Sequence, residues 1–183
     1  MDNGRIEKNK KIKVVPLAES DLERLIAWAE DERTMLEWCG PVFDFPLTIE
    51  QLQSYFAETK GNAPNRLIYK AVDESGNVAG MCELGAVSQK NESASLCRIF
   101  TDKNFRGKGI ANHLISEVLY IAFEQLALTR VELNVYTFNL PAIKCYEKLG
   151  FKREGMRRKS TKYNNEYWDG YIYSLLKEEW KAG

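Results

Sequence analysis

A short loop with two glycines, from Arg106 to Ala111, has the residue types of a phosphate-binding site. It reads Arg-Gly-Lys-Gly-Ile-Ala, follows a run with strand character and precedes an amphipathic run at helical spacing, residues 110–126. The first amides of a helix lack intrahelical partners and lie at the positive end of the helix dipole, so this arrangement binds anions. The glycines let the backbone approach a ligand closely, and the arginine and lysine add positive charge. We therefore expect the loop to hold a pyrophosphate.

Two common phosphate loops do not fit this segment. A Walker loop requires G-x-x-x-x-G-K-(S/T), which is absent. A dinucleotide-binding loop requires G-x-G-x-x-G, and Asn112 stands where the third glycine would be. That fold also needs repeated βαβ units, whereas hairpins are predicted ahead of this loop. A tight strand-to-helix connection without a ligand is the remaining alternative.

A second group of polar residues follows the next predicted strand, residues 131–136, and runs from Asn139 to Phe151. Asn139 and Tyr146 are seven residues apart, so they lie on nearly the same face of a helix. Taken alone, Asn139 fits a helix N-cap and Tyr146 fits a half-buried core aromatic.

Together the two motifs resemble the GNAT family of N-acetyltransferases. The loop matches that family's (R/Q)-x-x-G-x-(G/A) pattern, and N-L-P-A-I-K-C-Y-E-K-L-G-F matches its N-x-x-A-x-x-x-Y-x-K-x-G-F pattern at the expected separation. The resemblance covers about residues 11–178 and departs at Lys103, where many members have proline. The long helical segment after the first strand resembles the branch that includes ribosomal-protein N-terminal acetyltransferases.

The resemblance implies acetyl-coenzyme A as donor, an amine as acceptor and no metal. It also implies that the strands at residues 93–101 and 131–136 splay apart around the donor. The residues implied to bind the donor are Ile99, Phe100, Thr101, Arg106, Gly107, Lys108, Gly109, Ile110, Ala111, Asn139, Ala142 and Tyr146.

Tyr146 is the implied general acid, because a tyrosine with a pKa near ~10 is protonated at neutral pH and can protonate the departing thiolate. No cysteine nucleophile is needed, so direct transfer is expected. For the base that deprotonates the amine we expect Glu83, with Glu132 or an ordered water chain as alternatives. Glu83 also fits an ordinary strand carboxylate.

The segment between the first two strands is implied to line the acceptor site, and its aromatic and acidic residues suit a cationic amine. These residues are Trp28, Trp38, Phe43, Phe45, Glu30, Asp31, Glu32 and Asp44. They fit core aromatics and a solvated helix face equally well. The acceptor class stays open between a small molecule, polyamines and antibiotics included, and a protein or peptide N-terminus. A different class of function is a non-catalytic sensor that binds acyl-coenzyme A through the same fold.

These groups must be positioned by strands and helices, and the order of strand and helix patterns along the chain predicts the fold. We expect an α/β (α+β) domain with a mixed, mostly antiparallel sheet of about seven strands and about four helices. A capping box at Ser20 and Glu23 predicts a helix that continues to Trp38. Thr48 with Gln51 predicts a second helix start. The expected strands are residues 11–16, 66–72, 78–87, 93–101, 131–136, 151–158 and 167–176.

The composition is that of an ordinary globular chain. The 183 residues suit a single domain at 11–183 after a flexible N-terminal segment at 1–10. With 26 basic and 26 acidic residues, nothing indicates nucleic-acid or membrane binding. Four scattered cysteines and one histidine, His113, do not form a zinc set. We expect a reduced, cytoplasmic protein that is a monomer or homodimer.

Overall fold

The computed structural model describes residues 12–181, and the N-terminal segment expected to be flexible lies outside them. The strands are β1 (Lys13–Pro16), β2 (Leu67–Val72), β3 (Val78–Ser88), β4 (Ser93–Thr101), β5 (Arg130–Tyr136), β6 (Lys152–Tyr163) and β7 (Glu166–Leu176). The α-helices are α1 (Leu22–Trp28), α2 (Glu32–Cys39), α3 (Ile49–Ala57), α4 (Ile110–Tyr120) and α5 (Leu140–Lys148).

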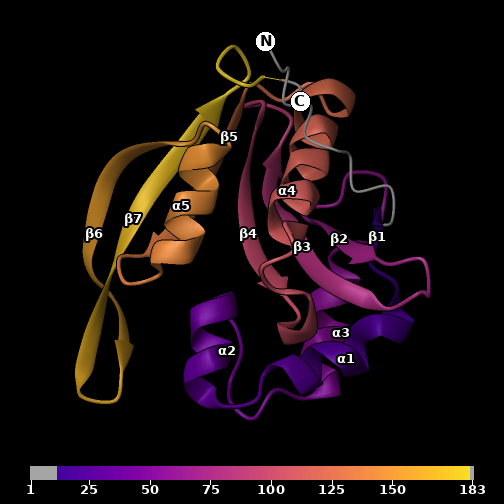
Figure 1. Ribbon diagram of the computed structural model, residues 1–183, viewed down its shortest axis with the longest axis vertical. Helices are drawn as coiled ribbons and strands as arrows, with labels where there is room; N and C mark the ends of the chain where they lie inside the picture. The colour runs from indigo at the N-terminus through magenta and orange to yellow at the C-terminus, as the bar shows by residue number, and fades with distance from the viewer. Residues whose placement is uncertain (1–11, 182–183) are drawn as a thin grey trace.

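The seven strands form one mixed sheet in the order β1-β2-β3-β4-β5-β7-β6 (Figure 1). Every pairing is antiparallel except that of β4 with β5. The predicted fold class and strand number are therefore confirmed, and the described residues contain five α-helices where about four were expected.

The extra helix arises because the first predicted helix is divided in two. Asp31 has extended backbone angles, and its carboxylate accepts the amide of Thr34 at 2.7 Å, so a new helix begins there. The predicted cap at Ser20 is also wrong: a 3-10 turn precedes α1, and the Asp21 carboxylate accepts the amide of Ala18 at 2.7 Å. The predicted start at Thr48 is confirmed, since its hydroxyl accepts the amide of Gln51.

Two hydrophobic cores cover opposite faces of the sheet. One is built on α4 and α5 with Leu84, Leu114 and Val131, and the other on α1, α2 and α3 with Leu25 and Met81. Figure 1 shows α4 in front of β3 and β4, and α5 in front of the β5–β7 side. Strand β3 is buried along most of its length because both of its faces are covered.

The centre of the sheet is open along part of its length. Strands β4 and β5 pair only at residues 93–95 with 130–132, and beyond this point they diverge (Figure 1). The unpaired edges therefore face each other across a gap, and side chains from both halves of the sheet line it.

Candidate active site

A β-bulge in β4 accompanies the divergence of β4 from β5. Met81 pairs with Phe100 and Glu83 pairs with Cys97, so two residues of β4 oppose one residue of β3. Such a bulge bends the strand that carries it. Arg98, inside the bulge, has a φ of 50°, a conformation that costs a non-glycine residue about 1–3 kcal/mol and needs support from its surroundings.

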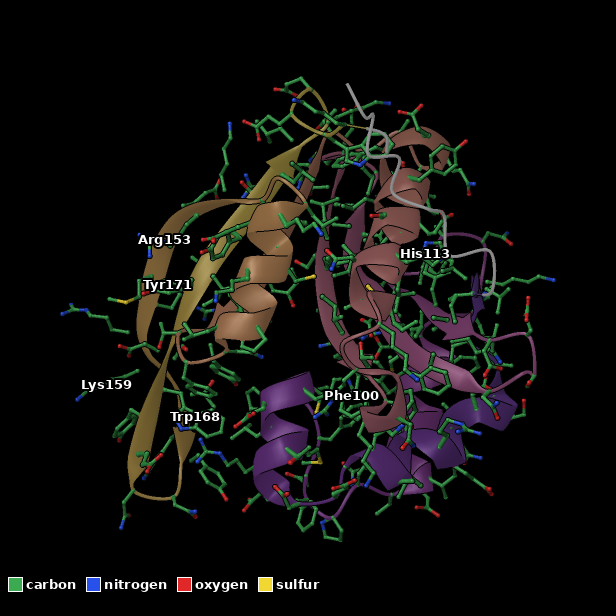
Figure 2. All side chains as sticks on the ribbon, in the orientation of Figure 1. Phe100, His113, Arg153, Lys159, Trp168 and Tyr171 are labelled. Carbon is green, nitrogen blue, oxygen red and sulfur yellow. The ribbon has the colours of Figure 1, made fainter. Side chains whose placement is uncertain are left out.

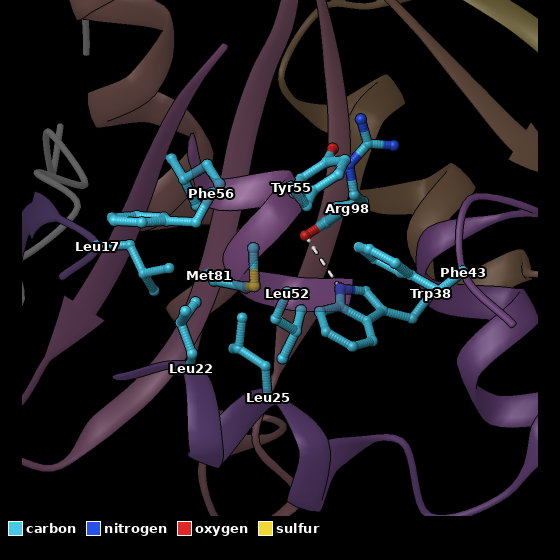
Figure 3. Close-up of a pocket in the computed structure, with 11 residues that line it drawn as sticks. Leu17, Leu22, Leu25, Trp38, Phe43, Leu52, Tyr55, Phe56, Met81 and Arg98 are labelled. Atoms are coloured by element: carbon cyan, nitrogen blue, oxygen red, sulfur yellow. Dashed lines mark hydrogen bonds between the residues drawn. The ribbon is translucent and has the colours of Figure 1, made fainter. Parts of the chain in front are cut away.

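Hydrogen bonds from two sides support Arg98. The indole of Trp38 in α2 donates to the Arg98 carbonyl at 3.1 Å (Figure 3). The Arg98 guanidinium donates to both carboxylate oxygens of Glu83, Nε to Oε2 at 2.8 Å and Nη2 to Oε1 at 2.9 Å. The bulge is thus held both through its backbone and through its side chain.

The Glu83 side chain is 0% exposed and is the centre of a larger network. The Tyr55 hydroxyl lies 2.9 and 2.8 Å from its two oxygens, and Arg66 Nη1 donates to Oε1 at 3.0 Å. Arg66 also stacks on the Tyr55 ring, 3.8 Å from the centroid, and pairs with Glu58. These contacts do not favour Glu83 as the general base, a role that stays a prediction, since both of its oxygens already accept hydrogen bonds. They suit a residue that positions β4.

A cavity of about 1030 Å³ fills the space between the diverging strands. It extends from the 106–111 loop and the start of α5 to α2 and the β6–β7 hairpin. Of the twelve residues expected to bind the donor, eleven line this cavity, and Lys108 does not. The Lys108 ammonium lies over the Phe105 ring instead, 5.4 Å from its centroid.

The glycine loop has the geometry expected of an anion cradle. Gly107 and Gly109 have φ values of +74° and +77°, and Gly109 is the N-cap of α4. No atom lies within 4 Å of a Cβ built on either glycine, so the space beside the loop is open. The loop and the first amides of α4 therefore suit the pyrophosphate of coenzyme A.

The second motif lies beside this loop, since the Cys145 thiol on α5 is 3.5 Å from the side-chain oxygen of Asn112 in the first turn of α4. The side-chain oxygen Oδ1 of Asn139 caps α5 by accepting the amide of Ala142 at 3.2 Å, and the NH₂ group of the same side chain is a further donor at the cavity wall. Tyr146 is 7% exposed, and burial raises the pKa of its hydroxyl. No residue between 12 and 181 hydrogen-bonds that hydroxyl, and no side-chain oxygen or nitrogen in this part of the chain is buried without a partner. The hydroxyl is therefore accessible from the cavity.

Three cysteines line the cavity. Burial raises the pKa of the Cys39 and Cys97 thiols to about 12 and also raises that of Cys145. All three are therefore thiols rather than nucleophilic thiolates near neutral pH.

The expected acceptor segment is mostly structural. Trp28 stacks on Phe100, Asp31 caps α2, and Glu30 pairs with Lys103. Of the eight aromatic and acidic residues expected at the acceptor site, only Trp38 lines the cavity. Sequence reasoning missed Glu37 and Arg157, which do line it, because neither belongs to a motif. Figure 2 shows His113 on α4, away from Phe100, and its Nε2 lies 3.2 Å from the carbonyl of Ile12.

The described part of the chain, residues 12–181, also bears on metal binding and on membrane insertion. Within them, no group of three or more His, Cys, Asp or Glu side chains is placed to hold a metal ion. Over the same residues, no helix is long and apolar enough to cross a membrane.

Comparisons with known proteins agree with this geometry. The sequence model of the Acetyltransferase (GNAT) family matches residues 22–151. The chain belongs to this family. The prophage-derived uncharacterized N-acetyltransferase YokL of Bacillus subtilis is 33% identical over 137 residues, which are 75% of this chain and 76% of YokL. The putative ribosomal N-acetyltransferase YdaF of Bacillus subtilis is 34% identical over 107 residues, 58% of each chain.

A solved structure shows the same fold. The spermidine N-acetyltransferase from Vibrio cholerae, in complex with CoA and spermine, superposes with a TM-score of 0.82 at 24% identity and covers 93% of this chain and 98% of its own. The protein is thus a GNAT N-acetyltransferase, an acetyl-CoA-dependent acyltransferase, and nothing among these relatives supports the non-catalytic alternative.

We predict that Gly109→Glu abolishes acetyl-CoA binding while the GNAT fold is retained. The new side chain would occupy the open space beside the loop and bring a carboxylate against the phosphates. Isothermal titration calorimetry measures the loss. Gly76→Glu is the matched control, since Gly76 has a φ of +81° and equally open surroundings in a hairpin turn. Acetyl-CoA affinity equal in the two variants would show that the donor binds elsewhere.

We predict that Glu83→Gln weakens acetyl-CoA binding and keeps the shape of the pH–rate profile. Removing the charge leaves two arginines without their buried partner, which lowers the free energy of unfolding by up to about 3–5 kcal/mol. Tyr55→Phe removes only a donor and should cost about 1 kcal/mol, so it tests the same network in a folded protein. Disappearance of the acid limb of kcat/KM in Glu83→Gln, with unchanged acetyl-CoA affinity, would instead make Glu83 the base.

Proposed function

We propose that the protein transfers the acetyl group of acetyl-CoA directly to a primary amine of a small molecule or of a protein or peptide N-terminus. The observation that carries this proposal is the cavity, which has an anion cradle and a buried, accessible tyrosine on its wall. Bound acetyl-CoA supplies the thioester that the amine attacks. In this proposal the 106–111 loop binds the pyrophosphate, and the unpaired edge of β4 at Ile99, Phe100 and Thr101 binds the pantetheine arm.

Tyr146 is the general acid of the proposal. Its raised pKa keeps the hydroxyl protonated at neutral pH, and it can donate that proton to the thiolate that leaves the acetyl group. Asn139, at the start of the same helix, offers its side-chain NH₂ group to the pantetheine or thioester region.

Direct transfer is favoured over an acetyl-cysteine intermediate. Each cysteine on the cavity wall has a raised pKa, so thiolate is scarce at neutral pH. For the base, Glu83 is bound by two arginines and Glu132 accepts from Arg130 at 3.1 Å. The contacts of both carboxylates therefore favour the third alternative, a water chain held by polar groups of the cavity.

An amine panel that follows free thiol tests the proposal. We expect primary amines to release coenzyme A from acetyl-CoA and thermal stability to rise with coenzyme A, because a ligand that binds only the folded state stabilises it. NADH and ATP at equal concentration should not produce that shift. Thiol release that is independent of every added amine, or an equal shift with NADH, would contradict the proposal.

We predict that Tyr146→Phe lowers kcat by about 10²–10⁴, the usual effect of losing a positioned acid. Acetyl-CoA affinity should stay near that of the wild type, since the loop amides are unchanged, and the loss should appear in kcat rather than in KM. Tyr173→Phe is the matched control, because Tyr173 is a buried tyrosine outside the cavity whose hydroxyl donates to Glu147. A wild-type rate in Tyr146→Phe, with chemistry rate-limiting, would make Tyr146 a packing residue.

A further inference from the structure

Strand β6, at one edge of the sheet, is strongly basic although the chain as a whole is neutral. Its twelve residues include one carboxylate, Glu154, and six cations. The cations are Lys152, Arg153, Arg157, Arg158, Lys159 and Lys162. All six are exposed, and in Figure 2 Lys159 points outward from the sheet.

Few of these cations have a carboxylate partner. Lys152 pairs with Glu179, and the salt bridges formed among residues 12–181 include none of the other five. Arg153 and Lys159 lie over the rings of Tyr171 and Tyr167, 4.7 and 5.1 Å from the centroids. The three remaining cations are exposed, and their like charges repel one another. We call them the basic edge: Arg157, Arg158 and Lys162.

The basic edge adjoins the end of the cavity opposite the 106–111 loop. Arg157 lines the cavity wall together with Ser160 and Thr161 of the same strand. Helix α2 bounds this end from the other side, where Arg33 lies 5.2 Å from the centroid of the Trp168 ring. Helix α2 and the β6–β7 hairpin thus meet at this end of the cavity and both line it.

The other charged side chains that line this half of the cavity are already paired. Glu37 accepts from Arg33 at 2.9 Å, and Arg98 is bound to Glu83. Of the charged side chains placed in this half of the cavity by the described structure, Arg157 alone lacks an ionic partner. A polycationic acceptor would meet a like charge here, and an anionic acceptor would meet an opposite one.

We propose that the basic edge binds an acidic segment of a polypeptide acceptor whose N-terminal amine enters the cavity. The inference rests on the proposed amine acetylation and specifies its acceptor. Arg157 and Lys162 pair with Gly170 and Tyr167 of β7, which are three residues apart, so at ~3.3 Å per residue they lie about 10 Å apart along the sheet and the acidic segment between them spans about three residues. Arg157 at the cavity wall meets the part of the segment nearest the amine.

Charges on an edge strand also prevent sheets from pairing edge to edge, and protection of that kind works with either sign. Here a bulge between Arg157 and Thr161, with Lys159 at a φ of 51°, already interrupts the edge. Protection of the β6 edge against pairing with another sheet therefore does not explain why its charged residues are mostly positive and why one of them, Arg157, lies on the cavity wall.

Peptides of ten residues with the same first two residues test the proposal, with residues 3–8 acidic, neutral or basic. We expect the acidic peptide to exceed the neutral one by about tenfold in kcat/KM at low salt, because several exposed charge pairs are each worth a few-fold. The difference should lie in KM and should shrink as NaCl is raised. The triple variant Arg157→Gln, Arg158→Gln, Lys162→Gln should lose the preference, so that acidic and neutral peptides react with similar kcat/KM.

The control is the triple variant Lys13→Gln, Lys90→Gln, Lys181→Gln, which removes three exposed charges away from the cavity and should keep the preference. Two results would overturn the proposal that the acceptor is an acidic peptide. One is equal rates with the acidic and neutral peptides, and the other is a faster reaction with spermidine or a free acidic amino acid than with the acidic peptide. Amine acetylation would survive either result, whereas failure of every peptide and amine would remove the proposed function itself.

Discussion

The ion pair between Glu83 and Arg98 is the interaction on which the rest of the structure depends. A carboxylate that is 0% exposed lies inside a sheet only because Arg98, Arg66 and Tyr55 all donate to it. In return it holds Arg98 at a φ of 50° and so fixes the bulge that bends β4. With β4 bent, its ladder to β5 ends after three residue pairs, and the cavity fills the opening. The network thus places charged groups in the interior of the protein, and the bulge that it holds keeps the rest of the β4 edge unpaired from β5.

The two ends of the cavity are made by different physical means. At the loop end, backbone amides and the dipole of α4 provide positive potential, so the backbone conformation of Gly107 and Gly109 matters more than side-chain charge. At the other end, side chains of α2 and β6 make the surface, and its character depends on which charges are paired. Between the ends, burial is the main cause of the raised pKa of Tyr146, and the neighbouring cysteines raise it further.

This division agrees with the comparisons. The family match ends at Phe151, just before β6, and covers the loop, the splayed strands and α5. The spermidine N-acetyltransferase shares the whole fold at 24% identity, so the fold is compatible with very different surface residues. A common donor needs a common backbone arrangement, whereas acceptors differ in charge and length and are met by side chains that the fold leaves free to vary.

The sequence by itself determined the family and the fold class, and eleven of the twelve residues that it predicted to bind the donor line the cavity. These predictions depend on local features: glycines before a helix, a capping asparagine and a tyrosine seven residues later. Only the tertiary structure decided the surroundings of Glu83, whose partners are 15 to 28 residues away in the chain, and the position of Arg157 on the cavity wall. It also directed Lys108 toward Phe105 and divided the first predicted helix at Asp31. Spacing along a chain specifies which residues share one helix face or one loop, whereas ion pairs and cavity walls depend on strand register and helix docking, which short sequence patterns do not encode.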